Sequence, residues 1–452
     1  MFNSKKNPII YGTLLLSISG LFCRGVGFFY HLFISRTFGE EAMGIFQLTS
    51  PILMLAFSLS GAGIQTAISK YTASQTAKSQ TGAAHYYLFY GCLISFSISF
   101  LSSLIIFLYS DTIAIHILGE EKCAILLRIC AFSFPLSSLH CCFNGYFYGR
   151  KNTLLPSITQ IVEQLIRIGS VLIIYYFYRL QSLTPSIAIT CIGMLLGEAA
   201  ALFLSSLFYL HNCNFFSTPL RPDLYKKCKN LLFSSTKIPT QLLSYSIPLT
   251  LNRVLINLLQ SYEAISLPTS LKKYGYSPKA ALSIYGVLTG MALSVVMFPS
   301  TFTNSASVLL LPTVSEAESD SLKGSPNNKL KKIIRRTIFF SLALGSFCTL
   351  FFYYFGNYCG NLLFHSTLAG RFIKTLSFLC PFLYLKLTLF SVLNGLKKTT
   401  KTLWINLFSI SLRLAAILFV VPYVGIYGYL YSLLFSDFLA SLSCFYFLRK
   451  LL

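Results

Sequence analysis

The sequence predicts an all-α, polytopic membrane protein with about twelve transmembrane helices in two pseudo-symmetric six-helix lobes around a central cavity. Three observations predict this fold class. Hydrophobic residues make up 54% of the 452 residues and charged residues only 11%, which is unlike a soluble domain. Apolar stretches of bilayer-spanning length recur from end to end. The second half of the chain repeats features of the first.

The first half contains six predicted spans, each a mostly apolar run bounded by basic or turn residues. About 20 residues at ~1.5 Å per residue cover the ~30 Å hydrocarbon core of a bilayer, and every run reaches that length. The spans are predicted at 8–35, 44–69, 84–110, 123–148, 154–178 and 186–210. They form a predicted N-terminal lobe, 1–210.

The second half begins with a basic, partly amphipathic segment, 211–238, predicted to be a cytoplasmic linker along the inner membrane surface. The C-terminal lobe, 239–452, again holds six apolar runs. A tight turn from Pro422 to Gly425 separates the last two. The spans are predicted at 239–268, 280–312, 333–364, 371–396, 402–424 and 425–448.

Basic residues predict the orientation. Most of the 36 Lys and Arg residues lie in segments that face the cytoplasm when the N-terminus is inside. Membrane topology therefore accounts for the net charge of +23, and no nucleic-acid partner is expected. No small-residue cleavage site follows the first apolar run, so no signal peptide is predicted. We expect a multi-pass protein of the bacterial inner cell membrane, in contact with membrane lipids, with both termini cytoplasmic.

An internal repeat relates the two halves. The segment Asn144–Thr153 (NGYFYGRKNT) is echoed by Asn394–Thr400 (NGLKKTT). An arginine follows each segment within the next span, Arg167 in the first half and Arg413 in the second. Because each half has an even number of spans, both halves begin on the same side of the membrane. The repeats are therefore parallel and related by an axis along the membrane normal.

Arg24 and Arg253 are the sharpest functional candidates. Each lies inside the first span of its half, where a charged side chain costs roughly 2.5–3.5 kcal/mol on insertion scales. Two unpaired guanidinium groups facing each other across a central cleft would bind a di-anion such as a pyrophosphate. The alternatives are an Arg24 that snorkels to the interface and two arginines that are paired separately for structure.

Other charged residues within the spans have structural or ion-binding interpretations. Glu163 and Arg167 are four residues apart on one predicted helix and are expected to pair. Arg413 has no acidic residue on its own helix, and its mirrored position suggests a packing or hinge role shared with Arg167. Glu198 and Asp437 lie at matching depth in the last spans of the two halves. They are candidates for ion binding or gating, or for pairing with basic residues.

No enzyme motif stands out in the sequence. We find no nucleotide-binding loop, no zinc motif and no catalytic pair of carboxylates. The six histidines are scattered and are interpreted as packed or interfacial residues, and the 13 cysteines have no metal-ligand spacing. We therefore expect no enzymatic activity, no cofactor and no metal site.

The segment Gly12–Ile52 carries a family resemblance. It has an arginine inside the first span, followed by Arg36, Gly39, Glu40 and Glu41, and Ala67–Lys70 (AISK) closes the second span. With these features the chain resembles the stage V sporulation protein B group. These proteins are polysaccharide flippases of the multidrug/oligosaccharidyl-lipid/polysaccharide (MOP) exporter superfamily. The likeness covers nearly the whole chain.

The resemblance implies a MATE-like, V-shaped fold of two lobes that open alternately to the inside and the outside. In the related lipid II flippases, arginines at positions matching Arg24 and Arg253 matter for transport. A further arginine of those relatives is replaced here around Tyr30 and His31, which makes the predicted cavity less basic. Twelve spans rather than fourteen imply that a groove made by two extra helices is missing.

The expected function is a flippase that moves a lipid-linked polysaccharide precursor, of peptidoglycan or another envelope glycan, to the outer leaflet. Membrane potential or a coupling cation would drive it. The alternative is a cation-coupled multidrug antiporter of the MATE type, which needs a buried acidic residue facing the cavity. A non-transporting scaffold or a glycan polymerase is a further alternative, and the short outer segments argue against a polymerase.

Overall fold

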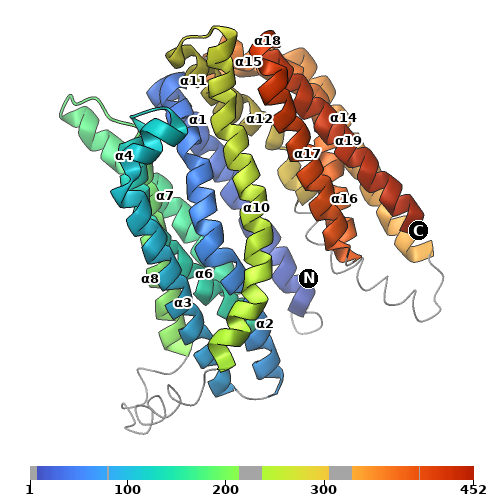
Figure 1. Ribbon diagram of the computed structural model, residues 1–452. Helices are drawn as coiled ribbons and strands as arrows, with labels where there is room; N and C mark the ends of the chain where they lie inside the picture. The colour runs from blue at the N-terminus through green and yellow to red at the C-terminus, as the bar shows by residue number, and fades with distance from the viewer. Residues whose placement is uncertain (1–7, 79–80, 213–236, 305–327, 397, 452) are drawn as a thin grey trace. The chain divides into compact units, whose positions relative to one another are not determined.

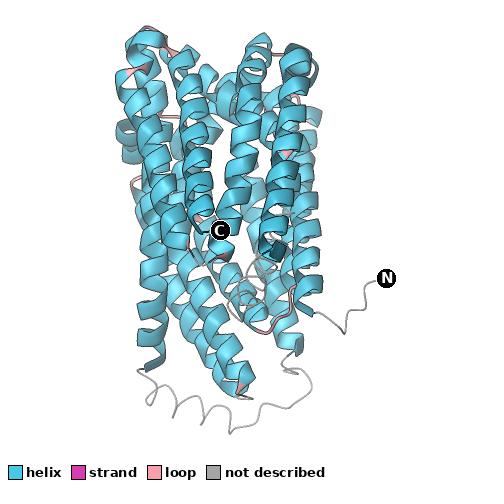
Figure 2. Cartoon of the chain, turned by 90° about the vertical axis from the view of Figure 1, so that its right-hand side faces the viewer, coloured by secondary structure: helices cyan, strands magenta, loops and turns pink. Residues whose placement is uncertain are grey.

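The computed structural model describes residues 8–78, 81–212, 237–304, 328–396 and 398–451. Every regular element in these ranges is a helix, and none is a strand (Figure 2). The prediction of an all-α protein is therefore confirmed. Almost all of the predicted linker, and the end of the eighth predicted span, lie outside the described residues.

The chain forms two compact units, each built from two stretches of sequence. Unit 1 comprises Met1–Ser19 and Thr49–Leu258, and unit 2 comprises Gly20–Leu48 and Leu259–Leu452. Two long helices therefore contribute residues to both units (Figure 1): α1 (Pro8–Phe57) and α10 (Lys237–Tyr274). The boundaries of the two predicted lobes stay a prediction.

Besides its parts of α1 and α10, unit 1 consists of helices from the first half of the sequence. These are the π-helix η1 (Ser58–Ala62), α2 (Gly63–Ala77), α3 (Thr81–Leu108), α4 (Ser110–Thr112), the π-helix η2 (Ile113–Leu118), α5 (Cys123–Ala131), α6 (Ser133–Gly149), α7 (Leu154–Leu180) and α8 (Ile189–Asn212). One apolar core of this unit is formed by α2, α3, α6 and the starts of α7 and α10.

Unit 2 contains the remaining described helices. These are α11 (Pro278–Gly286), the π-helix η3 (Val287–Ala292), α12 (Leu293–Met297), α14 (Asn328–Phe364), α15 (Thr367–Leu376), the 3₁₀-helix η4 (Ser377–Leu379), α16 (Cys380–Gly395), α17 (Thr399–Phe419), α18 (Val421–Val424) and α19 (Ile426–Leu451). The second span of each half contains a π-helical segment, η1 in the first and η3 in the second. This agreement supports the internal repeat.

Helix α1 is interrupted at Gly39. The residue has φ 81° and ψ −179°, a conformation essentially restricted to glycine. The apolar run Leu14–Ala77 has 64 residues, which at ~1.5 Å per residue is far longer than one crossing of a bilayer requires. The break at Gly39 falls between the spans predicted at 8–35 and 44–69, so this run accounts for both.

The number of candidate spans agrees with the prediction. Among the residues described, ten helices are long and apolar enough to cross a membrane, or eleven when the bent pair of α5 and α6 counts as one span. That pair bends by 43° and covers the span predicted at 123–148. Because the first run contains two crossings, the prediction of about twelve spans is confirmed. Gly425, with φ 72°, separates the last two helices, as predicted.

Large apolar side chains point outward from both units. Phe339, Tyr354 and Phe419, for example, are 74%, 73% and 72% exposed. Side chains of this kind are mostly buried in water-soluble proteins, whereas lipid tails are as apolar as the side chains themselves. Together with the candidate spans, this surface identifies a multi-pass membrane protein.

Candidate functional site

The two arginines predicted to bind substrate both lie on the helices shared between the units. Arg24 is on the part of α1 that belongs to unit 2, and Arg253 is on the part of α10 that belongs to unit 1. Both are exposed, and neither has a hydrogen-bond or ion-pair partner within the described ranges. Exposed guanidinium groups on apolar helices need water or an anion. Their role as substrate ligands stays a prediction.

Unit 2 buries Glu263 of α10 among partners from two other helices. Nε and a terminal nitrogen of Arg413, on α17, lie 2.8 and 3.1 Å from the two carboxylate oxygens. The Tyr429 hydroxyl of α19 donates to the first oxygen at 2.8 Å. The terminal nitrogen donates a hydrogen bond to Glu263, and Nε adds a charge contact without forming a hydrogen bond. Arg413, which has no acidic residue on its own helix, finds its partner across the unit.

A second buried ion pair in unit 2 involves Asp437. Lys386 Nζ of α16 lies 2.5 Å from Asp437 Oδ1 of α19, and the two residues are 8% and 2% exposed. Of the two interpretations for Asp437, ion binding and pairing with a basic residue, the structure shows the pairing. The carboxylate charge is matched within the protein.

Unit 1 buries its own set of charges among α6, α7 and α8. Glu163 and Arg167 form the predicted ion pair on α7. Gly193 and Gly197 on α8 let that helix approach α7 closely. A Cβ at Gly197 would lie 2.9 Å from the backbone oxygen of Glu163, which is closer than real side chains allow. This contact places the next residue of α8, Glu198, beside the pair.

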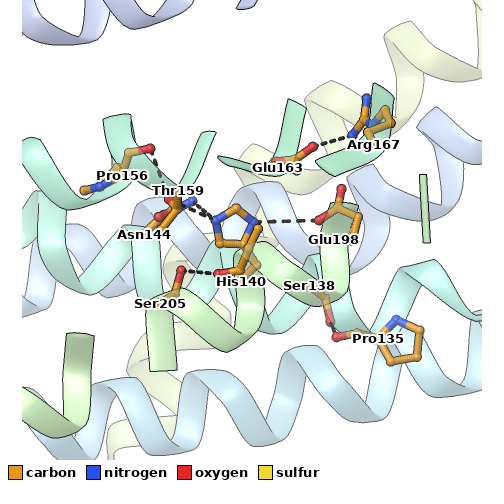
Figure 3. Close-up of polar contacts among 11 residues, drawn as sticks. Pro135, Ser138, His140, Asn144, Pro156, Thr159, Glu163, Arg167, Glu198 and Ser205 are labelled. Carbon is orange, nitrogen blue, oxygen red and sulfur yellow. Dashed lines mark hydrogen bonds and ion pairs between the residues drawn. The ribbon is translucent and has the colours of Figure 1, made fainter. Parts of the chain in front are cut away.

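Glu198 faces His140 of α6 (Figure 3). Glu198 Oε2 and His140 Nδ1 are 3.7 Å apart, and the two residues are 8% and 6% exposed. Oε2 is buried and has no hydrogen-bond partner. On the other side of the ring, His140 Nε2 lies 3.0 Å from the amide nitrogen of Asn144 and 3.4 Å from Thr159 Oγ1. Asn144 and Thr159 therefore orient the imidazole ring through its Nε2 atom, whereas one oxygen of the Glu198 carboxylate has no hydrogen-bond donor.

His140, Glu163 and Glu198 form one cluster, here named the unit 1 triad. Each offers one ligand atom, and these atoms lie within 4.8 Å of one another, an arrangement that no other group in the described part of the chain shows. Within the described ranges, Arg167 is the one permanent cation that forms an ion pair with a member of the triad. Arg167 pairs with Glu163, whereas Glu198 lies beside the His140 ring.

Sequence reasoning did not find the triad. It treated His140 as a packed residue and Glu198 as a separate ion-binding candidate. The three residues lie on three helices, and their sequence spacing follows no metal or catalytic motif. The sequence did contain one indication of such a site, namely three ionisable residues inside the apolar spans of the first half.

Arg36 and Glu40, two of the residues that carry the family resemblance, connect α1 to other helices of unit 2. Arg36 donates to the backbone oxygens of Leu362 and Leu363 at the end of α14, with Nε 2.5 Å from the latter. This satisfies carbonyl groups at a helix C-terminus. Glu40, directly after the break in α1, accepts hydrogen bonds from Ser283 at 2.7 Å and from Ser366, the N-cap of α15, at 2.5 Å.

Comparisons with known proteins agree with this architecture. A family model described as "Polysaccharide biosynthesis protein" matches residues 9–318. The chain belongs to this polysaccharide biosynthesis family. The match covers nearly all of unit 1 and, in unit 2, Gly20–Leu48 and residues 259–318; it includes both candidate arginines.

Two relatives of this family member come from Bacillus subtilis (strain 168). Stage V sporulation protein B is 26% identical over 377 residues, which are 82% of this chain and 70% of that protein. Sporulation protein YkvU is 22% identical over 373 residues, 82% of this chain and 78% of that protein. The resemblance to the stage V sporulation protein B group is thereby confirmed.

Solved transporter structures share the fold of this family member. An inward-facing multidrug resistance MATE family transporter of the MOP superfamily aligns with a TM-score of 0.68 at 12% identity, over 97% of this chain and 94% of that chain. A MOP superfamily transporter from Pyrococcus furiosus with a binding pocket of reverse polarity aligns with a TM-score of 0.66 at 14% identity, over 98% and 95%. The fold is therefore that of the MOP superfamily.

Proposed function

We propose that this family member is a flippase of the bacterial inner membrane. It moves a lipid-linked polysaccharide precursor, of peptidoglycan or another envelope glycan, from the cytoplasmic to the outer leaflet by alternating access. Membership of a polysaccharide biosynthesis family and the MOP transporter fold support a membrane transporter of this kind. In the proposed orientation both termini are cytoplasmic. The substrate is moved without chemical change, so no enzymatic step is proposed.

The observation that carries the proposal is that two arginines on apolar helices have no hydrogen-bond or ion-pair partner among the described residues. Arg24 and Arg253 are both exposed, and other guanidinium groups within the spans, such as Arg167 and Arg413, are paired. An unpaired charge there costs roughly 2.5–3.5 kcal/mol, which binding of an anion offsets. The planar fork of a guanidinium matches phosphate oxygens, and a pyrophosphate-linked lipid offers two adjacent phosphates.

In the proposed cycle, Arg24 and Arg253 hold the pyrophosphate while the binding site is open to the cytoplasm. The two halves of the protein then rock about the membrane normal, and the lipid tail remains in the bilayer. Membrane potential, worth ~2.3 kcal/mol per charge per 100 mV, or a coupling cation drives the movement.

Binding of an undecaprenyl-pyrophosphate-linked glycan to purified protein tests the proposal. The wild-type protein is expected to bind, and the R24A/R253A protein to lose binding by at least tenfold, since two charge-assisted contacts are removed. The R24K/R253K protein keeps both charges without the fork and is expected to lie between them. Arg128→Ala is the matched control, because it removes an arginine that is ion-paired with Asp111.

Properly inserted R24A/R253A protein that binds the glycan lipid as tightly as the wild type would contradict the proposal. A flippase assay in liposomes makes the same comparison, between the wild-type and R24A/R253A proteins, for transport instead of binding. Retained flipping in the double variant would show that the substrate passes elsewhere.

The second candidate function is a cation-coupled multidrug antiporter of the MATE type. The unpartnered, buried Oε2 of Glu198 favours it, whereas Asp437 is neutralised by Lys386. Transport of a cationic drug that is lost in Glu198→Gln and kept in R24A/R253A would establish the antiporter. The opposite pattern supports the flippase.

A further inference from the structure

We propose that the unit 1 triad, His140, Glu163 and Glu198, binds one divalent transition metal ion of the Zn²⁺ type. The three side chains come from α6, α7 and α8, and one ligand atom of each lies within 4.8 Å of the others (Figure 3). This site involves neither Arg24 nor Arg253, so it does not rest on the proposed flippase function.

The separation between His140 and Glu198 is the first argument. Nδ1 and Oε2 are 3.7 Å apart, which is longer than a hydrogen bond. Two atoms bound to one Zn²⁺ ion at about 2.0–2.2 Å, in a tetrahedral arrangement, lie roughly 3.3–3.6 Å from each other. The observed separation therefore resembles that of two ligands around a shared ion.

The unsatisfied oxygen of Glu198 is the second argument. The residue is only 8% exposed, and its Oε2 atom has no hydrogen-bond partner although it faces the His140 ring. A buried carboxylate oxygen without a partner is costly, because neither water nor protein compensates its charge. A metal ion between Oε2 and Nδ1 satisfies both atoms together.

The charges around the triad leave room for a cation. Arg167 is paired with one oxygen of Glu163, so this carboxylate is both neutralised and fixed in position. With a neutral imidazole, Glu198 has no ion-pair partner among the residues that the structure describes. In a low-dielectric interior such an excess charge attracts a cation strongly.

The donor types select the class of ion. One imidazole nitrogen and two carboxylates suit first-row transition metals such as Zn²⁺, whereas Mg²⁺ and Ca²⁺ prefer oxygen ligands alone. A metal on His140 Nδ1 leaves the ring proton on Nε2. The Asn144 amide has its nitrogen toward Nε2, and a 180° flip of the amide presents its oxygen instead; that oxygen and the Thr159 hydroxyl then accept the proton. Such second contacts orient metal-binding histidines in general.

A titration of the purified full-length protein with Co²⁺, a spectroscopic stand-in for Zn²⁺, tests the proposal. The protein is first treated with a chelator and kept in detergent. We expect one Co²⁺ per chain at micromolar metal, with the strong visible absorption of a four- or five-coordinate site, and full displacement by Zn²⁺. Mg²⁺ in large excess should leave the spectrum unchanged.

Three substitutions and a control locate the bound ion. Glu198→Gln and His140→Asn each remove a ligand and should abolish the absorption, and Asn144→Leu should weaken binding by about 10–100-fold, as expected for a second contact. His116→Asn is the matched control, because His116 is exposed on η2 outside the triad. Gel filtration shows that each variant is folded.

Absence of a Co²⁺ spectrum in the wild-type protein would overturn the proposal. A spectrum that persists unchanged in Glu198→Gln would do the same, because Gln has the shape of Glu and the variant is expected to fold. Neither result bears on the binding of glycan lipid by Arg24 and Arg253, so the two proposals fail separately.

Discussion

Unit 2 surrounds Glu263 with a guanidinium and a phenol, whereas unit 1 leaves one oxygen of Glu198 without a donor. Both carboxylates are buried within apolar helices, at 6% and 8% exposure. The difference lies in the direct partners of each carboxylate. Glu263 contacts the permanent cation Arg413, whereas in the described residues Arg167 pairs with Glu163 and the Glu198 carboxylate faces the His140 ring.

This difference separates two uses of a buried charge. A carboxylate whose oxygens are all matched stabilises one packing arrangement and has nothing left to offer a ligand. Burial of a carboxylate that has an oxygen without a partner costs free energy unless a ligand or ion binds to that oxygen. On this argument the Glu263 and Asp437 pairs are structural, and the unit 1 triad is the site with capacity for a further ion.

Removing the charge of Glu263 should have the largest effect. Glu263→Gln leaves Arg413 buried without its counter-charge, and a guanidinium cannot release its proton. Breaking a buried pair in this way costs about 3–5 kcal/mol. Thermal unfolding followed by the fluorescence of Trp404, the only tryptophan and also on α17, measures the loss in unit 2.

The double variant E263L/R413L is the control for that experiment. Replacing both charges with apolar groups removes the unpaired cation, and such replacements are often neutral or stabilising. We expect the double variant to recover most of the lost stability. A Glu263→Gln protein as stable as the wild type would show that the pair contributes little to unit 2.

Lys386→Met should have a smaller effect of the same kind. The variant leaves Asp437 buried without its ion-pair partner, but a carboxyl group, unlike a guanidinium, can take up a proton and become neutral. We expect a loss of about 2–3 kcal/mol, below that of Glu263→Gln. Thermal unfolding followed by Trp404 fluorescence again measures this loss of stability. The double variant K386M/D437L is the matched control, because it removes both charges. A loss larger than that of Glu263→Gln would contradict this order.

Arg167→Met should destabilise unit 1 by less, about 1–2 kcal/mol, since the Arg167 and Glu163 side chains are 25% and 17% exposed. Reaction of a thiol dye with Cys142 and Cys191, both fully buried in unit 1, measures unfolding of this unit separately once the other cysteines are replaced by serine. Arg167→Lys keeps the charge and should behave nearly as the wild type. An unchanged rate of labelling in Arg167→Met would show that the two carboxylates do not depend on this cation.

Much of the fold follows from local sequence. The apolar runs predict the spans because a bilayer imposes a minimum length on every crossing helix, and Gly39 and Gly425 mark breaks whose positive φ favours glycine. The pair of Glu163 and Arg167 was also predictable, because a helix fixes which residues four positions apart are neighbours. What was not predictable is the exchange by which α1 and α10 each contribute to both units.

The partners of the other charges could not be predicted, because they depend on packing between distant helices. Arg413 and Glu263 are 150 residues apart in sequence, and Lys386 and Asp437 are 51 apart. Mirrored positions in the repeat suggested similar roles for Arg167 and Arg413, yet one pairs within its helix and the other across the unit. The two halves thus place an arginine at a similar position along the span, but the repeat does not determine which residue that arginine pairs with.

Glu198→Gln should have the smallest effect on stability, and it is the sharpest test of the comparison. Because Oε2 has no hydrogen-bond partner, little is lost when the charge is removed, and repulsion with Glu163 is relieved. With a chelator present, the free energy of unfolding of unit 1 should change by less than about 1 kcal/mol. The thiol-labelling assay measures it beside Glu121→Gln, an exposed control.

A loss as large as that of Glu263→Gln would mean that Glu198 is a structural partner after all. In that case the two units treat their buried carboxylates alike.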